Sequence, residues 1–148
     1  AISGHSGVAI GSEMSGGVDN VRVWDCDFVG AWYGIHVKGT KERGGYVKNV
    51  DVRDSKVSSI VIWHVDYNTD GASAQSMPIF SDYHFENLEV TGFHSDYVRI
   101  KGFDEDEYAV KNVTLKDIAL INVEEKKALR LENYKDIRLE NVKTKIKI

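Results

Sequence analysis

Short runs of alternating apolar and polar residues recur along the chain and define its organisation. The first run reads VDNVRVWDCDF from Val18, and related runs begin at Val47, Phe85, Val110 and Tyr134. These starts lie 29, 38, 25 and 24 residues apart. Periods of this length are typical of stacked repeats rather than of an ordinary sandwich. We therefore interpret the chain as a series of similar structural units.

Inside each run the alternation shifts once by a single residue. In the first copy, Val21 and Val23 are followed by Cys26 and Phe28, so the period of two is interrupted and then resumes. A flat strand with such a shift would turn its apolar set to the other face, whereas two strands joined by a one-residue bend would not. The bend is expected at residue types that tolerate unusual backbone angles, namely Asp25, Asp54, Gly92, Asp117 and Asn141.

A second apolar run follows each first one, as GIHVK from Gly34, SIVIW from Ser59, DYVRI from Asp96 and ALRLE from Ala128. Two or three short strands per unit, with no helical spacing, predict an all-β fold. The fold predicted is a right-handed single-stranded parallel β-helix of about five coils. A β-sandwich with coincidental internal similarity is the alternative, but it does not explain why the shift recurs in step.

Amide side chains recur with the repeats and are expected to stack. If like residues align from coil to coil, they form an amide ladder inside the solenoid, hydrogen-bonded along the stack. The residues concerned are Asn20, Asn49, Asn87, Asn112 and, in the fifth copy, Asp136.

Length and charge narrow the classes of function. The chain has 148 residues with a net charge of −4, which suits one β-helix segment over residues 1–148 and argues against a nucleic-acid or anionic-membrane partner. No apolar run approaches the roughly 18 residues of a membrane helix. The single Cys26 leaves no internal disulfide. Because the chain opens on Ala1 in a loop-like sequence, we expect it to be part of a longer β-helix.

Polar residues at the ends of strands, beside long loops, mark the candidate site. In GIHVK, His36 and Lys38 share a parity and point outward, while Ile35 and Val37 point inward. Two cationic or cationisable groups on one patch suit a ligand that carries a carboxylate. Tyr67 precedes the longest loop, NTDGASAQSMPIFSD, and can stack on a sugar ring.

A histidine near the start of the chain is the other candidate. His5 lies among Ser3, Gly4, Ser6 and Gly7, whose small side chains leave the imidazole open to a ligand. The five histidines show no metal-ligand spacing, so neither a metal nor another cofactor is expected. For each of these residues, an ordinary surface or core position is the alternative interpretation.

Three segments resemble glycoside hydrolase family 28, the polygalacturonases. GHSGVAIGSEMSGGVDNV is similar to the Gly-His-Gly region of that family. GIHVKGTKERGG resembles its Arg-Ile-Lys segment, and VDYNTDG resembles the segment that supplies a substrate-contacting tyrosine. Order and spacing agree, and the resemblance covers essentially the whole chain but only about the C-terminal half of a family member.

The resemblance implies a role for each candidate. His5 would tune the catalytic carboxylates, Tyr67 would pack near the reacting sugar, and Lys38 would bind the substrate carboxylate. His36 stands where the family has arginine, and this substitution loses a permanent bidentate fork. Ser6 replaces the second glycine of the first motif. The substrate class implied is therefore a pectin-type or other uronate-containing glycan, cleaved with inversion by a secreted or periplasmic enzyme.

The catalytic carboxylates of the family lie upstream of the segments found here. Hydrolysis needs two carboxyl groups facing the glycosidic bond. Asp25 and Asp27 lie two residues apart, but Asp25 falls on the predicted bend, so we interpret the two as a structural turn. The isolated chain is therefore expected to be inactive. Its open first coil, at residues 7–11, is expected to pair with a missing N-terminal half or with another copy.

Two other functions remain open from the sequence. One is a non-catalytic carbohydrate-binding or structural β-helix module, favoured by His36 and by the missing acids. The other is a β-helix lyase or epimerase, which ranks last because no acidic calcium cluster follows a strand.

Overall fold

The computed structural model describes residues 4–67, 76–92 and 96–148, whose strands form two parallel sheets. The first sheet has five strands, and the chain passes through it once per turn of the solenoid. In spatial order they are β1 (Gly4–Ile10), β4 (Ala31–Gly39), β6 (Ile60–His64), β8 (Val98–Lys101) and β10 (Leu129–Glu132).

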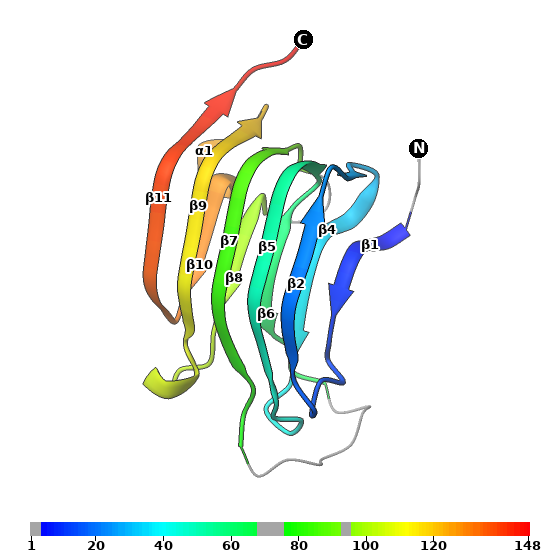
Figure 1. Ribbon diagram of the computed structural model, residues 1–148. Helices are drawn as coiled ribbons and strands as arrows, with labels where there is room; N and C mark the ends of the chain where they lie inside the picture. The colour runs from blue at the N-terminus through cyan, green and yellow to red at the C-terminus, as the bar shows by residue number, and fades with distance from the viewer. Residues whose placement is uncertain (1–3, 68–75, 93–95) are drawn as a thin grey trace.

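The second sheet has six strands. Its order is β2 (Val18–Trp24), β5 (Tyr46–Val57), β7 (Ile79–Val90), β9 (Val110–Ile121) and β11 (Tyr134–Lys145), with the short β3 (Asp27–Phe28) also paired to β5. Successive coils stack side by side from β1 and β2 at one end to β11 at the other (Figure 1). The predicted all-β parallel β-helix is confirmed, with about four turns rather than five.

Helical structure is confined to two single turns in the described part of the chain. They are η1 (Asp106–Tyr108) and α1 (Glu125–Ala128). No helix among the described residues is long and apolar enough to cross a bilayer.

The core lies between the two sheets and is built from columns of like residues. Strict parallel register aligns the same position of each coil, as in the column Val23, Val52, Phe85, Leu115 and Leu139. The first four members of this column are at most 8% exposed. Leu139 is 48% exposed, because it lies on β11, the edge strand of its sheet, which pairs with β9 on one side only.

Two bends interrupt each long strand of the second sheet, five residues apart. The bend residues all adopt left-handed angles, with φ between 52° and 66°, which Asn and Asp tolerate better than other non-glycine residues. They stack in two columns across the coils. The first contains Asn20, Asn49, Asp82, Asn112 and Asp136, and the second contains Asp25, Asp54, Asn87, Asp117 and Asn141.

The predicted internal amide ladder is therefore wrong in two respects. The asparagine side chains lie on the outside of the solenoid rather than in its core. Their bonds also do not join amide to amide, because the amides of Asn49, Asn87 and Asn112 each donate to a carboxylate on the preceding coil. Asn87 donates to Asp54 at 2.7 Å, and Asn112 donates to Asp82 at 2.6 Å.

The third repeat begins earlier than the sequence pattern indicated. Phe80, not Phe85, pairs with Val47, so the third long strand starts within the stretch predicted to be loop. Asn87 occupies the second bend, and the first bend is Asp82. The predicted bend at Gly92 lies beyond the end of β7, although its φ is positive at 74°.

Candidate functional site

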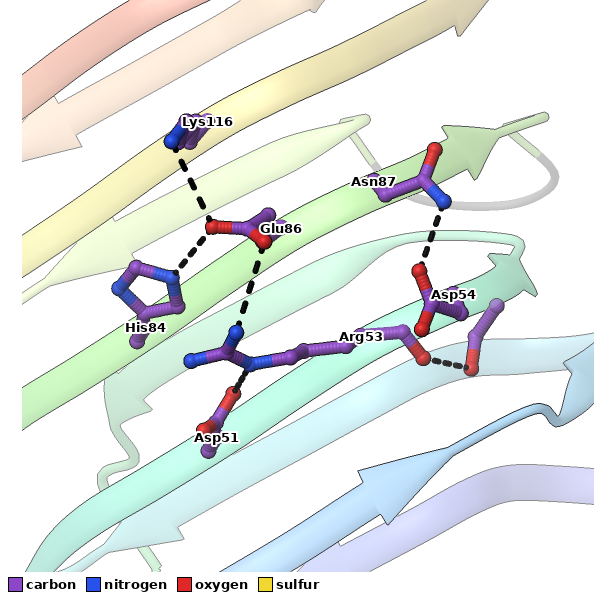
Figure 2. Close-up of polar contacts among 8 residues, drawn as sticks. Asp51, Arg53, Asp54, His84, Glu86, Asn87 and Lys116 are labelled. Carbon is purple, nitrogen blue, oxygen red and sulfur yellow. Dashed lines mark hydrogen bonds and ion pairs between the residues drawn. The ribbon is translucent and has the colours of Figure 1, made fainter.

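The outer face of the six-stranded sheet carries charges that satisfy one another. Arg53 contacts Asp51 at 2.7 Å and Glu86 at 3.5 Å, and Glu86 also contacts His84 and Lys116 (Figure 2). These carboxylates raise the pKa of the Arg53 guanidinium, chiefly through the hydrogen bond that Arg53 Nε–H donates to Asp51. Because these charged groups are already paired with one another, they are poor candidates for binding a charged ligand.

The outer face of the five-stranded sheet holds the candidate residues. Ile35 and Val37 are buried in the core, so His36 and Lys38 lie on the opposite face of β4, as their parity predicted. Parallel register places Ala9 and Val61 beside His36, and Trp63 beside Lys38.

Aromatic rings cover His36 almost completely. The ring of Tyr33 lies 4.2 Å from that of His36, with Trp63 at 5.9 Å and His5 at 5.8 Å between ring centroids. His36 is consequently only 3% exposed although it lies on the outer face of its sheet. Trp32, which stacks against His5 at 6.3 Å, remains 47% exposed. The cluster therefore presents aromatic surface over a buried imidazole.

A hydrogen-bonded chain crosses three strands and fixes the position of the proton on His36. Trp63 Nε1 donates to His36 Nε2 at 3.0 Å. An indole nitrogen can only donate, so Nε2 of His36 must accept and its proton lies on Nδ1. Nδ1 then donates to Ser6 Oγ at 3.2 Å, and Ser6 Oγ is within hydrogen-bond distance, 3.1 Å, of Nδ1 of the exposed His5.

The surroundings of His36 keep its imidazole neutral at physiological pH. Burial, followed by the charges of Lys38 and His5, lowers the pKa of His36 from 6.5 to about 4. Both of its ring nitrogens are also occupied by Trp63 and Ser6. His36 thus supports the position of His5 and leaves Lys38 as the cation of this patch.

Replacing the indole donor tests this arrangement. In the Trp63→Phe variant, Nε2 of His36 loses its donor and becomes free to take up a proton, so the pKa of His36 should rise toward 6.5. Titration of the imidazole signals by NMR measures the shift. Trp24→Phe, which makes the same change on the opposite sheet, should leave His36 unaffected. An unchanged pKa in Trp63→Phe would contradict the donor assignment.

Lys38 and Tyr67 come together at the same edge of the cluster. Lys38 Nζ lies 5.6 Å from the centre of the Tyr67 ring, and the Tyr67 hydroxyl hydrogen-bonds to Ser12 Oγ at 2.7 Å. A contact with an aromatic face leaves the three ammonium hydrogens able to donate. Within the described part of the chain, Lys38 makes no ion pair with a carboxylate.

The structure therefore brings together all four residues singled out in the sequence. His5 reaches Lys38 and Tyr67 through His36 on β4. The sequence did not single out Tyr33 and Trp63, which the stacking of coils brings against His36. It showed Ser6 only as a replacement for a glycine, whereas Ser6 links the two histidines. Trp63 occupies the same position in its strand as Lys38 does one coil earlier. This equivalence is the sequence signal that could have identified Trp63.

Two further expectations concern the surroundings of the site. Asp25 and Asp27 are structural, as predicted: Asp25 forms a left-handed bend and Asp27 accepts a hydrogen bond from the backbone of Val29. Residues 68–75 of the long loop after Tyr67 lie outside the described residues. Among the described residues, no group of three or more acidic, histidine or cysteine side chains is arranged to hold a metal ion.

The chain has a partial similarity to a known protein. A segment of 46 residues, 31% of the chain, is 48% identical to a protein described as a probable polygalacturonase from Vitis vinifera. The segment covers 9% of that protein, so the chain matches only a small part of its length. No protein-family model matches the chain. The similarity and the parallel β-helix agree with the resemblance that the sequence motifs indicated.

Proposed function

We propose that this chain forms the substrate-positioning part of a polygalacturonase-like glycoside hydrolase that acts on pectin-type polysaccharide. The observation that carries the proposal is the unpaired Lys38 ammonium beside the Tyr67 ring, at the edge of an aromatic cluster. Ammonium and carboxylate form charge-assisted hydrogen bonds, and aromatic faces stack on sugar rings. An acidic sugar offers both features to such a surface.

Each residue of the cluster has a distinct part in this proposal. Lys38 binds the carboxylate of a galacturonate residue, and Tyr67 packs near the reacting sugar. The exposed His5 faces the space where the catalytic carboxylates operate and favours their charged form. Neutral His36 holds His5 through Ser6 without competing for the substrate carboxylate.

The catalytic acids are assigned to a part of the enzyme outside this chain. The charges that act most on His36 are those of Lys38 and His5, not of a carboxylate. Asp25 and Asp27 have structural roles. In the complete enzyme, which we place outside the cytoplasm, hydrolysis proceeds with inversion and without a cofactor, while the chain alone binds its substrate without cleaving it.

Binding of trigalacturonate tests the proposal. Lys38→Ala is expected to weaken binding roughly 10-fold or more, the cost of losing a hydrogen bond to a charged group. Isothermal titration calorimetry measures the affinity. Lys48→Ala is the matched control, because Lys48 also lies over a tyrosine ring, Tyr46 at 4.8 Å, but on the opposite sheet.

Three outcomes separate the alternatives. Absence of binding by wild type, or equal effects of the two lysine variants, would contradict the assigned site. Release of reducing ends by the chain alone at enzyme-like rates would place the catalytic acids within it. A second candidate function, a non-catalytic carbohydrate-binding β-helix, is favoured by the exposed Trp32; it would be supported if neutral galactotriose bound as well as trigalacturonate.

A further inference from the structure

A second concave surface adjoins the aromatic cluster on the five-stranded sheet. This pocket has a volume of about 670 Å³ and shares Tyr33 and Trp63 with the cluster. Its remaining lining includes Arg99 on β8, Arg130 on β10 and Lys127 on α1. The pocket is therefore bordered by aromatic rings at one side and by basic groups from the next two coils.

Arg99 is nearly buried at this pocket and is not fully paired. Its exposure is 7%, and its Nη1 has no hydrogen-bond partner among the residues that the structure describes. Nη2 reaches only Glu132, at 3.5 Å, and the Glu132 side chain is half exposed. A buried charged donor without a partner costs free energy that a bound acceptor would recover.

Arg130, which lines the same pocket, differs from Arg99 because it has a close carboxylate partner. Arg130 contacts Asp96 at 2.8 Å, so the Asp96 carboxylate is already used. Glu124, the other acid of the lining, lies 3.6 Å from Lys126 outside the pocket. No carboxylate of the described lining residues contacts Nη1 of Arg99.

We propose that this pocket is a second uronate-binding subsite, in which Arg99 binds the carboxylate of an acidic sugar that lies against Trp63 and Tyr33. The inference rests on the proposed function, because the acidic sugar belongs to the glycan held at Lys38. A guanidinium can bind a carboxylate through two parallel hydrogen bonds. Arg99 and Lys38 lie two strands apart, about 10 Å across the sheet, so one oligosaccharide can reach both and a monosaccharide cannot.

The stability of an Arg99 variant separates a binding role from a structural one. Methionine has a similar length and no charge, so Arg99→Met removes the unpaired group while it keeps the packing of the stem. The melting temperature of this variant should equal or exceed that of wild type. A structural arginine would instead leave the variant with a lower melting temperature.

Binding measurements by NMR and calorimetry complete the test. Arg99→Met should weaken trigalacturonate binding roughly 10- to 100-fold and leave the weak binding of galacturonic acid at Lys38 unchanged. Arg22→Met is the matched control, because Arg22 lies beside Trp24 on the opposite sheet. In wild type, the Arg99 Nε–H signal should shift with trigalacturonate and not with neutral galactotriose.

The outcomes distinguish this inference from the proposed function. If Lys38→Ala weakens trigalacturonate binding and Arg99→Met does not, the second subsite is overturned and the proposed function stands. If only Arg99→Met weakens it, the site assigned to Lys38 fails and the pocket remains. An Arg99 signal that does not respond to trigalacturonate, or wild type that binds no acidic glycan, overturns the subsite.

Discussion

Lowering the pH from about 7.5 to 4.5 is expected to destabilise the protein by about 2–3 kcal/mol through His36 alone. The folded state lowers the pKa of His36 from 6.5 to about 4, mainly by burial. As the pH falls below 6.5, the unfolded chain takes up a proton on this residue and the folded protein does not. The loss of stability therefore develops between pH 6.5 and 4 and does not grow below that window.

Urea unfolding at several pH values, in wild type and in His36→Gln, isolates this contribution. Glutamine keeps an acceptor for Trp63 and a donor for Ser6 but does not titrate. The free energy of unfolding of His36→Gln should therefore fall by about 2–3 kcal/mol less than that of wild type over this pH range. His64, whose pKa is also lowered by burial, contributes equally to both curves. His84→Gln, on the opposite sheet, is the control. Parallel curves for wild type and His36→Gln would show that His36 is not held neutral.

Leu115→Ala is expected to lower the free energy of unfolding by about 2–5 kcal/mol, the usual range for a leucine truncated in a packed core. Leu115 is completely buried between the two sheets. In a solenoid each coil contacts only its neighbours, so a cavity in a central coil weakens the interfaces on both sides of it. Denaturant unfolding measures the loss.

The same column of the solenoid supplies a matched control. Leu139 pairs with Leu115 in register, one coil further along, but is 48% exposed. Leu139→Ala makes an identical change at an equivalent position and should cost less than about 1 kcal/mol. Similar losses in the two variants would mean that burial in this column does not decide stability.

The sequence by itself determined the type of fold, because its signals are local. A period of two that shifts once per repeat requires a bend, and Asn or Asp at the bend identifies where the backbone turns. Parity also placed His36 and Lys38 on the outer face of their strand. These features depend only on neighbours along the chain, so each copy carries them independently.

The register of the third coil was decided only by pairing between coils. Each long strand has two bends five residues apart, and Asn and Asp exchange between them, so Asn87 resembles a first bend although it is a second one. The apolar positions around Asn87 are compatible with either bend assignment. Alignment with Val47 on β5, which places Phe80 in the core, selects one of them.

The character of the site also depends on tertiary structure. Ser6, His36 and Trp63 lie about 30 residues apart in the sequence, one on each of three successive coils. Their stacking buries an imidazole that parity alone would leave in water, and that burial makes it neutral. The packing of β8 between its neighbouring coils likewise buries Arg99 beside a pocket and leaves its Nη1 without a partner among the described residues. Charge and exposure at these positions are properties of contacts between coils, and the alternation within one strand does not encode them.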